Sequence, residues 1–518
     1  MCDDSYMTRW TILVRDSLAG AIAAAIAIGI SELIAGILAG APSLVGSIGQ
    51  AVINLQPAGA KDFVVGLFGT NDKLALETFI VVVALGIAAA LGIAARWRFP
   101  VAVAGFAIAG VVAGLAALAD PQASPVLAVL TPAVASVAGI QTLSWLLGER
   151  DPTTQSATTP AASMPDWSRR GFVLKAGGVA VGAVAFGLLG RSFIDRRERV
   201  ADQAGTILQP PGQTASIPPG AELPVEGITP LVMPNDQFYR IDTALFAPSV
   251  GIEDWHLRVH GMVDREVDLT YAQLANLPMF EQYVTIACVS NKVGGDLVGN
   301  AKWTGVSLRE VLAMAGVQAG ATQLVGRSVD DWTAGMPTDW VMDESRKPMI
   351  ALEMNDKPLP TVHGFPARLI VPGLFGYVSA TKWLAELELT TWEAFDAFWI
   401  PRGWAKKGPI LTQSRIDVPR ATQVAAGPVT VAGVAWAPDR GVSRVEVGID
   451  DAWHDATLST PISKATWVQW RFNWDATPGR HVLAVRATDG TGETQTSQGT
   501  AEAPDGARGW HTIEVSVG

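Results

Sequence analysis

Residues 285–308 of the chain read TIACVSNKVGGDLVGNAKWTGVSL. The residues before Cys288 are rich in β-branched and aromatic side chains, so Cys288 is predicted to end a strand and to open a loop rich in Gly and Asn. A free cysteine is most often a small buried apolar residue. In such a loop it is also a candidate nucleophile or soft metal ligand. As a nucleophile it would need a base, and His363 is the obvious candidate.

Composition places part of the chain in lipid. The 518 residues are 49% hydrophobic and only 17% charged, whereas soluble domains carry about 25% charged residues. The length suggests about three domains. The net charge of −11 argues against a nucleic-acid partner, which would need a basic surface.

The cysteines and histidines exclude several kinds of metal site. The two cysteines, Cys2 and Cys288, are far apart, and no CxxC or CxxCH occurs. This removes c-type haem attachment and the usual zinc and iron–sulfur spacings. All six histidines follow residue 255, so the first half of the chain cannot hold a bis-histidine haem. We therefore expect no haem.

Five apolar stretches have about the length needed to cross a membrane as helices. They are Leu18–Gly40, Leu74–Ala95, Val101–Ala119, Val126–Leu147 and Phe172–Gly190. Arginines flank the first, third and fifth stretches on the side that would be cytoplasmic. The prediction is a multi-pass bundle at residues 1–190 in a bacterial cell membrane. The N-terminus is expected in the cytoplasm, and the chain after residue 190 is expected on the extracytoplasmic face.

The sequence SRRGFVLK at residues 168–175 resembles a twin-arginine export signal placed inside the chain. That pathway exports folded proteins, typically those that acquire a cofactor first. The alternative is a pair of ordinary cytoplasmic arginines beside a helix. Glu32 is the clear acid within the spans, and it is either functional or simply packed against neighbouring helices. Frequent Gly and Ala predict close helix packing, and the bundle is interpreted as an anchor.

The second half changes character twice. Residues 191–228 are predicted to be a linker rich in Pro, Gly and Gln. Residues 229–408 mix predicted strands, such as WHLRVHGMV and WLAELELTTW, with short helices such as SLREVLAMAGV, which indicates an α+β domain. Residues 409–518 alternate as strands joined by Gly, Pro and Asp turns and predict an immunoglobulin-like β-sandwich.

Several motifs in this half point to one family. They are C-x-x-N at Cys288 and Asn291, W-x-G-V-x-L at residues 303–308, AGV at residues 315–317, and HGFPARLIVPGLFGYVSATKW at residues 363–383. From about residue 229 to residue 412 the chain resembles the sulfite oxidase family of molybdenum enzymes. The C-terminal β-domain resembles that family's dimerisation domain, which implies a possible homodimer.

The resemblance implies a molybdenum–molybdopterin cofactor and roles for particular residues. Cys288 would be the metal-bound thiolate and so a catalytic residue. The cofactor would also be held by Asn235, Tyr239, Arg240, His363, Arg368, Ser379 and Lys382. Of these, Arg368, Ser379 and Lys382 match phosphate-binding positions, where charged forks suit a phosphate. The segment between Arg368 and Lys382 is one residue longer than in familiar members, which leaves the assignments at Ser379 and Thr381 open to a shift of one position.

Two further positions concern the substrate. Arg240 matches the family's arginine near the substrate oxyanion. Trp404 stands where sulfite-oxidising members have a Tyr near the metal, so the resemblance does not imply sulfite itself. Arg402, Lys406 and Lys407 favour a small anionic or strongly polar substrate. Structural roles stay open for Arg368 as a strand-edge charge, and for Tyr239 and Trp404 as core aromatics.

The leading hypothesis is a membrane-anchored molybdopterin oxidoreductase that exchanges electrons with a separate cytochrome or quinone-linked carrier. Sulfite oxidation and reduction of an S- or N-oxide are both open. One alternative is a non-catalytic surface binding module with a degenerate enzyme domain. A transporter is a weaker alternative, because no broken-helix pattern accompanies the spans.

Overall fold

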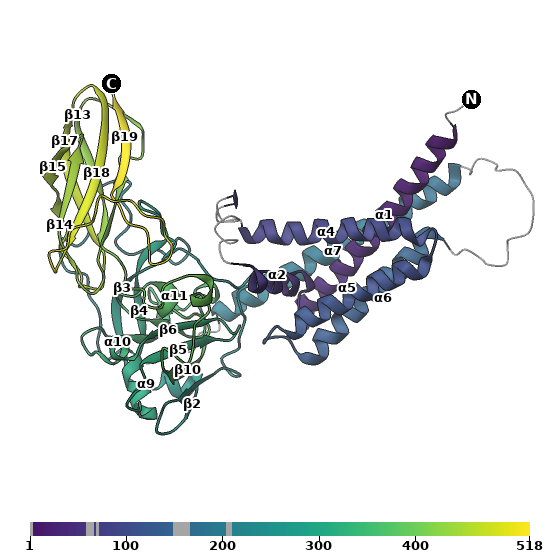
Figure 1. Cartoon of the computed structure of the whole chain (residues 1–518), viewed down its shortest axis with the longest axis horizontal. Coiled ribbons are helices and arrows are strands. Elements are labelled where there is room, and N and C mark those ends of the chain that lie inside the picture. Colours follow the sequence, from purple (N-terminus) through teal and green to yellow (C-terminus); the bar gives the residue numbers. More distant parts are fainter. Residues whose placement is uncertain (1–3, 58–66, 69–71, 149–165, 204–209) are drawn as a thin grey trace, which may run out of the picture. The chain divides into compact units, whose positions relative to one another are not determined.

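The computed structural model describes residues 4–57, 67–68, 72–148, 166–203 and 210–518. The chain forms two compact units. The first comprises Met1–Val200 with Thr243–Ala247, and the second comprises Ala201–Asp242 with Pro248–Gly518. Figure 1 shows that the described part of the first unit is helical, whereas strands dominate the second. The boundaries that we predicted at residues 228 and 408 lie inside the second unit and remain predictions.

The first unit is built from long apolar helices. They are α1 (Asp4–Ile37), α2 (Leu44–Leu55), α4 (Asp72–Ala95), α5 (Phe99–Leu118), α6 (Pro125–Leu147) and α7 (Asp166–Gln203). Five segments, one in each helix except α2, are long and apolar enough to cross a membrane. The prediction of five such helices is confirmed. Helix α2, which begins after the N-cap Ser43, was not predicted, because twelve residues are too few to span a bilayer.

Glycines let the helices approach closely. A Cβ on Gly92 of α4 would lie 2.1 Å from the carbonyl oxygen of Asp16 in α1, and one on Gly20 would lie 2.0 Å from that of Ala88. A Cβ on Gly36 would similarly meet the backbone of α7. Contacts this short exclude any side chain, which is how small residues pack membrane helices. The close helix packing predicted from the frequent Gly and Ala is therefore present.

Two acids of the first unit, Asp16 and Glu32, are buried. Glu32 is 9% exposed and accepts a hydrogen bond from the Ser43 hydroxyl at 2.7 Å, so it packs against a neighbouring segment. Asp16 is also buried and pairs with Arg15 at 2.8 Å. Since Asp16 lies in the apolar segment 13–37, Glu32 is not the single internal acid that we inferred from the sequence.

A short piece of the second half packs on α2. The Leu245 N–H donates to Gln50 at 3.0 Å. A Cβ on Gly46 would lie 2.4 Å from the Phe246 ring, and one on Gly49 would lie 2.5 Å from Leu245. Residues 243–247 therefore belong to the helical unit, although the sequence placed them in the α+β domain. Their apolar side chains fill the space left by the glycines.

Helix α7 is longer than predicted. It contains SRRGFVLK and continues as helix to Gln203, so the segment from residue 191 to 203 is helical rather than part of a linker. Charged residues such as Arg196 and Arg199 are good helix formers, which explains why the helix does not stop at the end of its apolar stretch. The export role of the motif remains a prediction.

The second unit contains two sheets that carry the predicted site, one with both parallel and antiparallel strands and one with antiparallel strands. One has the order β2-β1-β10-β5-β6, with β1 and β10 parallel. The other has the order β3-β4-β7-β8, with β9 beside β7. The strands of the first sheet are β1 (His256–Gly261), β2 (Val267–Thr270), β5 (Gln323–Ser328), β6 (Thr333–Pro337) and β10 (Leu384–Thr390). Those of the second are β3 (Met279–Ala287), β4 (Val298–Ser307), β7 (Met349–Met354), β8 (Lys357–Pro358) and β9 (Arg368–Ile370).

Short helices connect these strands, as an α+β domain requires. They are α8 (Tyr271–Ala275), α9 (Leu308–Ala315), α10 (Thr338–Met342), α11 (Gly376–Ser379) and the 3₁₀ turns η3 (Thr361–His363) and η4 (Ile400–Arg402). The strands and helices expected from WHLRVHGMV, QYVTIACVSN, SLREVLAMAGV, ARLIVPG and WLAELELTTW are all present. The loop expected after Cys288 is shorter than predicted. Its second half is β4, whose residues are mostly buried on both faces and so lack a polar alternation.

The C-terminal part is all β. One sheet has the order β11-β13-β17-β16 and the other has the order β12-β19-β18-β14-β15. Their strands are β11 (Gln413–Val418), β12 (Gln423–Val424), β13 (Gly427–Trp436), β14 (Val442–Ile449), β15 (Ala452–Asp455), β16 (Thr457–Leu458), β17 (Val468–Ala476), β18 (Gly479–Asp489) and β19 (His511–Val517). Inward residues of both sheets, including Trp470 and Val485, share one apolar core. A β-rich domain is thus present, and its likeness to immunoglobulin domains stays a prediction.

Candidate active site

Cys288 lies at a tight turn directly after β3. Its N–H donates to the Leu297 carbonyl at 2.9 Å, and its carbonyl accepts from the Asn291 N–H at 3.1 Å. The Asn291 side-chain oxygen accepts from the Leu297 N–H at 2.9 Å. This bond explains the C-x-x-N spacing, because Asn291 ties the far end of the loop back to the turn. The thiol is 8% exposed, at the edge of the core.

The C-terminal strands also hold this loop. Arg415 donates to the Gly295 carbonyl at 2.7 Å. The ring of His511 packs on Gly294, whose φ of +76° and lack of space exclude a side chain. Burial, and secondarily Arg415, lowers the pKa of His511. The Ile416 N–H donates to the His511 ring at 2.9 Å. These contacts between the loop and the C-terminal strands were not predicted, because Arg415 and His511 lie more than a hundred positions from the glycines that they contact.

His363 is oriented by the backbone. Its Nε2 lies 2.8 Å from the carbonyl oxygen of Asn235, so we assign the ring proton to Nε2, which leaves Nδ1 as an acceptor. Burial, and then the charge of Lys382, lowers the pKa of His363 to about 3. The ring is therefore neutral near pH 7. It can accept a hydrogen bond from a polar ligand edge, but it is not a base already paired with Cys288.

The Asn235 side chain is used within the protein. Its amide donates to the Met354 carbonyl at 3.1 Å and its oxygen accepts from Asn355 at 2.7 Å. Asn355 occupies the β7–β8 turn with a φ of +53°, and its role was not predicted from the sequence. The Asn-Asp pair at residues 355–356, between two apolar runs, was the available hairpin signal. Asn235 therefore positions its own backbone, which in turn orients His363.

Aromatic rings fix the segment that carries Tyr239. The Tyr239 ring stacks on Phe238 with centroids 5.3 Å apart, and Phe238 meets the edges of Trp303 and His363. Burial raises the pKa of Tyr239, Cys288 raises it further, and Arg368 lowers it. The phenol thus lies within electrostatic reach of both residues, so Tyr239 is more than a distant core aromatic.

Arg368 is a buried cation. It is 3% exposed, donates from one terminal nitrogen to the His363 carbonyl at 3.0 Å, and lies over the Trp303 ring at 5.0 Å. Its Nε has no hydrogen-bond partner among the described residues. Burial lowers its pKa to about 10, which still leaves it charged. A buried charge without an ion-pair partner in the described part of the chain calls for an anion.

Lys382 and Arg240 share one carboxylate. The Lys382 ammonium donates to Asp242 at 2.9 Å and to the Val362 carbonyl at 3.0 Å. The Arg240 Nε donates to the same oxygen of Asp242 at 3.0 Å. Burial lowers the pKa of Lys382 to about 8. These contacts bring Arg240 and Lys382 together, although 140 residues separate Asp242 from Lys382.

Gly364 makes this convergence possible. Its φ is +113°, and a Cβ there would lie 3.0 Å from the Cα of Lys382 and 3.2 Å from the Cβ of Arg368. Only glycine adopts such a positive φ readily and has no Cβ to collide with these neighbours. The Gly in the His363-Gly-Phe-Pro-x-Arg368 block therefore has a structural reason.

Ser379 and Trp404 lie apart from this network. The Ser379 hydroxyl donates to the carbonyls of Leu374 and Phe375 at 3.1 and 2.9 Å. Thr381 donates similarly to Gly326 at 3.4 Å. Trp404 packs on Tyr377 and Trp399 with centroids 6.0 and 6.4 Å away. Both hydroxyls are satisfied by backbone, so their phosphate roles remain predictions, as does a substrate role for Trp404.

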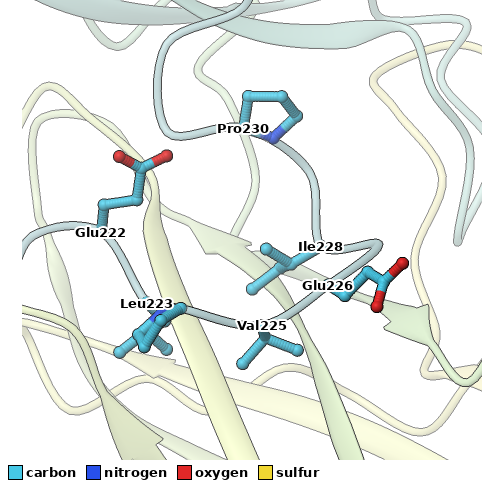
Figure 2. A pocket seen from close by; sticks show the side chains of 7 residues that line it. Glu222, Leu223, Val225, Glu226, Ile228 and Pro230 are labelled. Carbon is cyan, nitrogen blue, oxygen red and sulfur yellow. The ribbon is translucent and has the colours of Figure 1, made fainter.

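Other possible sites are less convincing. A hollow of about 540 Å³ is lined by Glu222, Leu223, Pro224, Val225, Glu226, Ile228 and Pro230, and Figure 2 shows these side chains. All its lining residues come from one stretch, and none is a predicted site residue. Among the described residues, no group of three or more His, Cys, Asp or Glu side chains could hold a metal ion. A metal at Cys288 would thus depend on ligands other than protein carboxylates and imidazoles.

Comparison with known proteins agrees with this site. The profile of the oxidoreductase molybdopterin binding domain matches residues 244–399. An uncharacterised oxidoreductase, YuiH, of Bacillus subtilis is 31% identical over 154 residues, which are 30% of this chain and 74% of that protein. The chain belongs to the sulfite oxidase family of molybdopterin-dependent oxidoreductases.

A curated relative and a solved structure are also similar to the chain. Human mitochondrial sulfite oxidase is 29% identical over 317 residues, covering 52% of this chain and 58% of that one. The sulfane dehydrogenase SoxCD of Paracoccus pantotrophus is a structural neighbour with a TM-score of 0.49 and 22% identity, covering 58% and 86% of the two chains. The chain spans a little more than half the length of the sulfite oxidases it matches.

The residues of this family member fit a molybdopterin. Arg368 presents an unpaired buried Nε, Lys382 adds an ammonium, and His363 offers Nδ1 as an acceptor. The Asn291 side-chain amide, beside the Cys288 turn, is a second buried donor without a partner among the described residues. Unpaired buried donors are rare in folded proteins. They are what a site for an anionic, polar cofactor requires.

Proposed function

We propose that the chain is a membrane-anchored, extracytoplasmic molybdopterin-dependent oxidoreductase that moves an oxygen atom to or from a small polar substrate. The observation that carries the proposal is the buried, unpaired Nε of Arg368 beside His363. No apolar or structural role requires an uncompensated charge there. Family membership supports the phosphate end of the cofactor as the proposed anion.

The proposed holding residues act by charge and hydrogen bonding. Arg368 and Lys382 bind phosphate, since charged donors make the stronger hydrogen bonds. The neutral His363 would accept a hydrogen bond from a polar edge of the pterin through Nδ1, and Tyr239 would help to hold the cofactor. Cys288 supplies a soft thiolate ligand. When bound, the molybdenum cofactor supplies a two-electron couple and an oxygen-transfer site.

The overall reaction balances in either direction. Sulfite and water would give sulfate with two protons and two electrons. An S- or N-oxide with two protons and two electrons would give the reduced compound and water. The electrons pass to or from a separate carrier, which would be a cytochrome or a quinone-linked protein. Arg240 would orient the substrate oxygen, and Trp404 would close over the substrate.

The helical unit would serve as the anchor. Five helices have the length and composition to cross a membrane, and the arginines near residues 9–15, 96–98 and 150–170 favour a cytoplasmic N-terminus. The SRRGFVLK motif would then export a folded, cofactor-loaded second unit. By family analogy the C-terminal β-domain would mediate dimerisation.

The test is molybdenum per chain. The full-length protein is expressed in a bacterium with a twin-arginine pathway, and metal is measured in wild type, Cys288→Ala and Arg368→Gln. We expect close to one molybdenum in wild type. In the variants we expect turnover of sulfite or of dimethyl sulfoxide to be lost. A well-folded wild type without molybdenum would overturn the proposal and leave a surface binding module.

A further inference from the structure

Asp242 is a carboxylate inside the cationic part of the site. Its side chain is 6% exposed, and one of its oxygens accepts from both Arg240 at 3.0 Å and Lys382 at 2.9 Å. Arg240 is the residue assigned to the substrate, and Lys382 is assigned to the cofactor. A single carboxylate therefore partly neutralises the two cations that would otherwise attract anions.

The charges around the site nearly balance once a cofactor is present. Among the described residues that make these contacts, Arg368, Lys382 and Arg240 are cationic, Asp242 is anionic and His363 is neutral near pH 7, so these five side chains together carry about +2. A phosphate monoester carries about −1.5 to −2. Little positive charge remains for the substrate. Asp330, whose electrostatic partners include Asp242, can only make the balance more negative.

The loop that carries Trp404 holds some of its cations through contacts of its own. Lys406 forms an ion pair with Asp396 at 2.6 Å and donates to the Trp392 carbonyl. Arg402 donates to the Phe398 carbonyl at 2.6 Å and lies over that ring. Of the cations at residues 402–407, which the sequence suggested would favour an anion, Lys406 is thus paired with a carboxylate, and Arg402 is held by a backbone carbonyl and a ring.

We propose that Asp242 is a specificity-determining residue, which lowers the affinity of the site for anions and so favours an uncharged polar substrate over a dianion such as sulfite. Asp242 acts through Arg240, whose only hydrogen bond in the described part of the chain is made by Nε. The two terminal nitrogens can still donate to a substrate oxygen. Arg240 thus keeps its geometry, while Asp242 partly offsets its charge. The inference rests on the proposed function and narrows its substrate class.

Sulfate binding by the loaded, full-length protein tests this without turnover. Molybdenum content is measured first, and sulfate is then titrated calorimetrically into wild type, Asp242→Asn and Asp242→Glu. We expect Asp242→Asn to bind sulfate about tenfold more tightly, since one charge removed a few ångströms from an anion changes binding by that order. Asp242→Glu keeps the charge and should stay near wild type. Asp268→Asn, which removes an exposed carboxylate paired with His256, is the matched control.

A double variant assigns the effect to Arg240. In Arg240→Gln/Asp242→Asn the gain in sulfate affinity should disappear, because the cation that Asp242 neutralises is gone. If Asp242→Asn folds poorly, Asp242→Ser removes the same charge and carries the measurement. Loaded variants that bind sulfate within about twofold of wild type would overturn the role of Asp242 and leave the proposed function intact. A wild type without molybdenum would instead refute the proposed function.

Discussion

The guanidinium of Arg368 donates to the backbone carbonyl of His363, five residues earlier, at 3.0 Å. The same arginine lies over Trp303 and leaves its Nε without a partner among the described residues. The contact orients a buried positive charge and shapes the 3₁₀ turn that presents His363. One residue thus fixes the local fold and carries the charge that we propose to bind an anion, which makes its substitution informative.

Replacing Arg368 separates charge from geometry. We expect Arg368→Gln to lose molybdopterin almost completely, because a phosphate would face no buried cation. Arg368→Lys keeps the charge but loses the planar fork, so partial loading is expected, several-fold below wild type. Pterin fluorescence and metal analysis of purified protein measure both. Equal loading in Arg368→Gln and wild type would show that this arginine does not hold the cofactor.

Gly364 is expected to tolerate no side chain. Gly364→Ala places a Cβ 3.0 Å from the Lys382 backbone at a φ of +113°, and strain of this kind costs about 1–3 kcal/mol. Gly403→Ala is a matched control, since Gly403 also has a positive φ but nothing within 4 Å of its Cβ position. Thermal unfolding in detergent should show the larger loss for Gly364→Ala. Similar losses in both would mean that the approach of Lys382 adds nothing to backbone strain.

His363 should make the unloaded protein sensitive to acid. Its folded pKa of about 3 lies below the unfolded value near 6.5, so unfolding takes up a proton between these limits. Stability should therefore fall as the pH drops from about 6.5 toward 3, by at most about 1.4 kcal/mol per pH unit. In His363→Gln the free energy of unfolding should depend less on pH between about 6.5 and 3. An unchanged pH profile in the variant would place the acid sensitivity elsewhere.

Lys382 should act in a separate, alkaline range. Burial lowers its pKa to about 8 in the folded protein, against 10.5 unfolded, so the unfolded chain binds more protons between these values. Stability of the unloaded protein should rise with pH across that range. Lys382→Met should remove the rise. Denaturant unfolding at pH 8 and pH 10 measures it, and a slope retained in Lys382→Met would contradict the assignment.

The packing of α1 against α4 is expected to need Gly92. A Cβ there would lie 2.1 Å from the Asp16 carbonyl, so Gly92→Leu must push the helices apart. Gly86→Leu, on the same helix, adds a side chain where nothing lies within 4 Å. We expect the first variant to lower the melting temperature in detergent by several degrees and the second to have little effect. Equal effects would argue against close packing at Gly92.

Patterns local in the sequence predicted much of the fold. Five apolar stretches became the five long apolar helices, because length and hydropathy suffice for a membrane span. Strands such as β10 and helices such as α9 followed from their periodicity. Strand β4 did not, because it is buried on both faces and carries Gly and Asn. Helix α7 ran on to Gln203 because charged residues also form helix, and hydropathy does not mark such an end.

The sequence by itself determined which side chains are candidates for the chemistry. Cys288, His363, Arg368 and Lys382 were proposed as site residues from motifs that resemble those of the family. Only the tertiary structure decided how they are used. In the structure Asp242 accepts hydrogen bonds from both Arg240 and Lys382, and Asn355 donates to Asn235. The Ser379 hydroxyl donates to the backbone carbonyl of Phe375. Periodicity and motifs report neighbours along the chain, whereas charge balance depends on loops that meet across 140 residues.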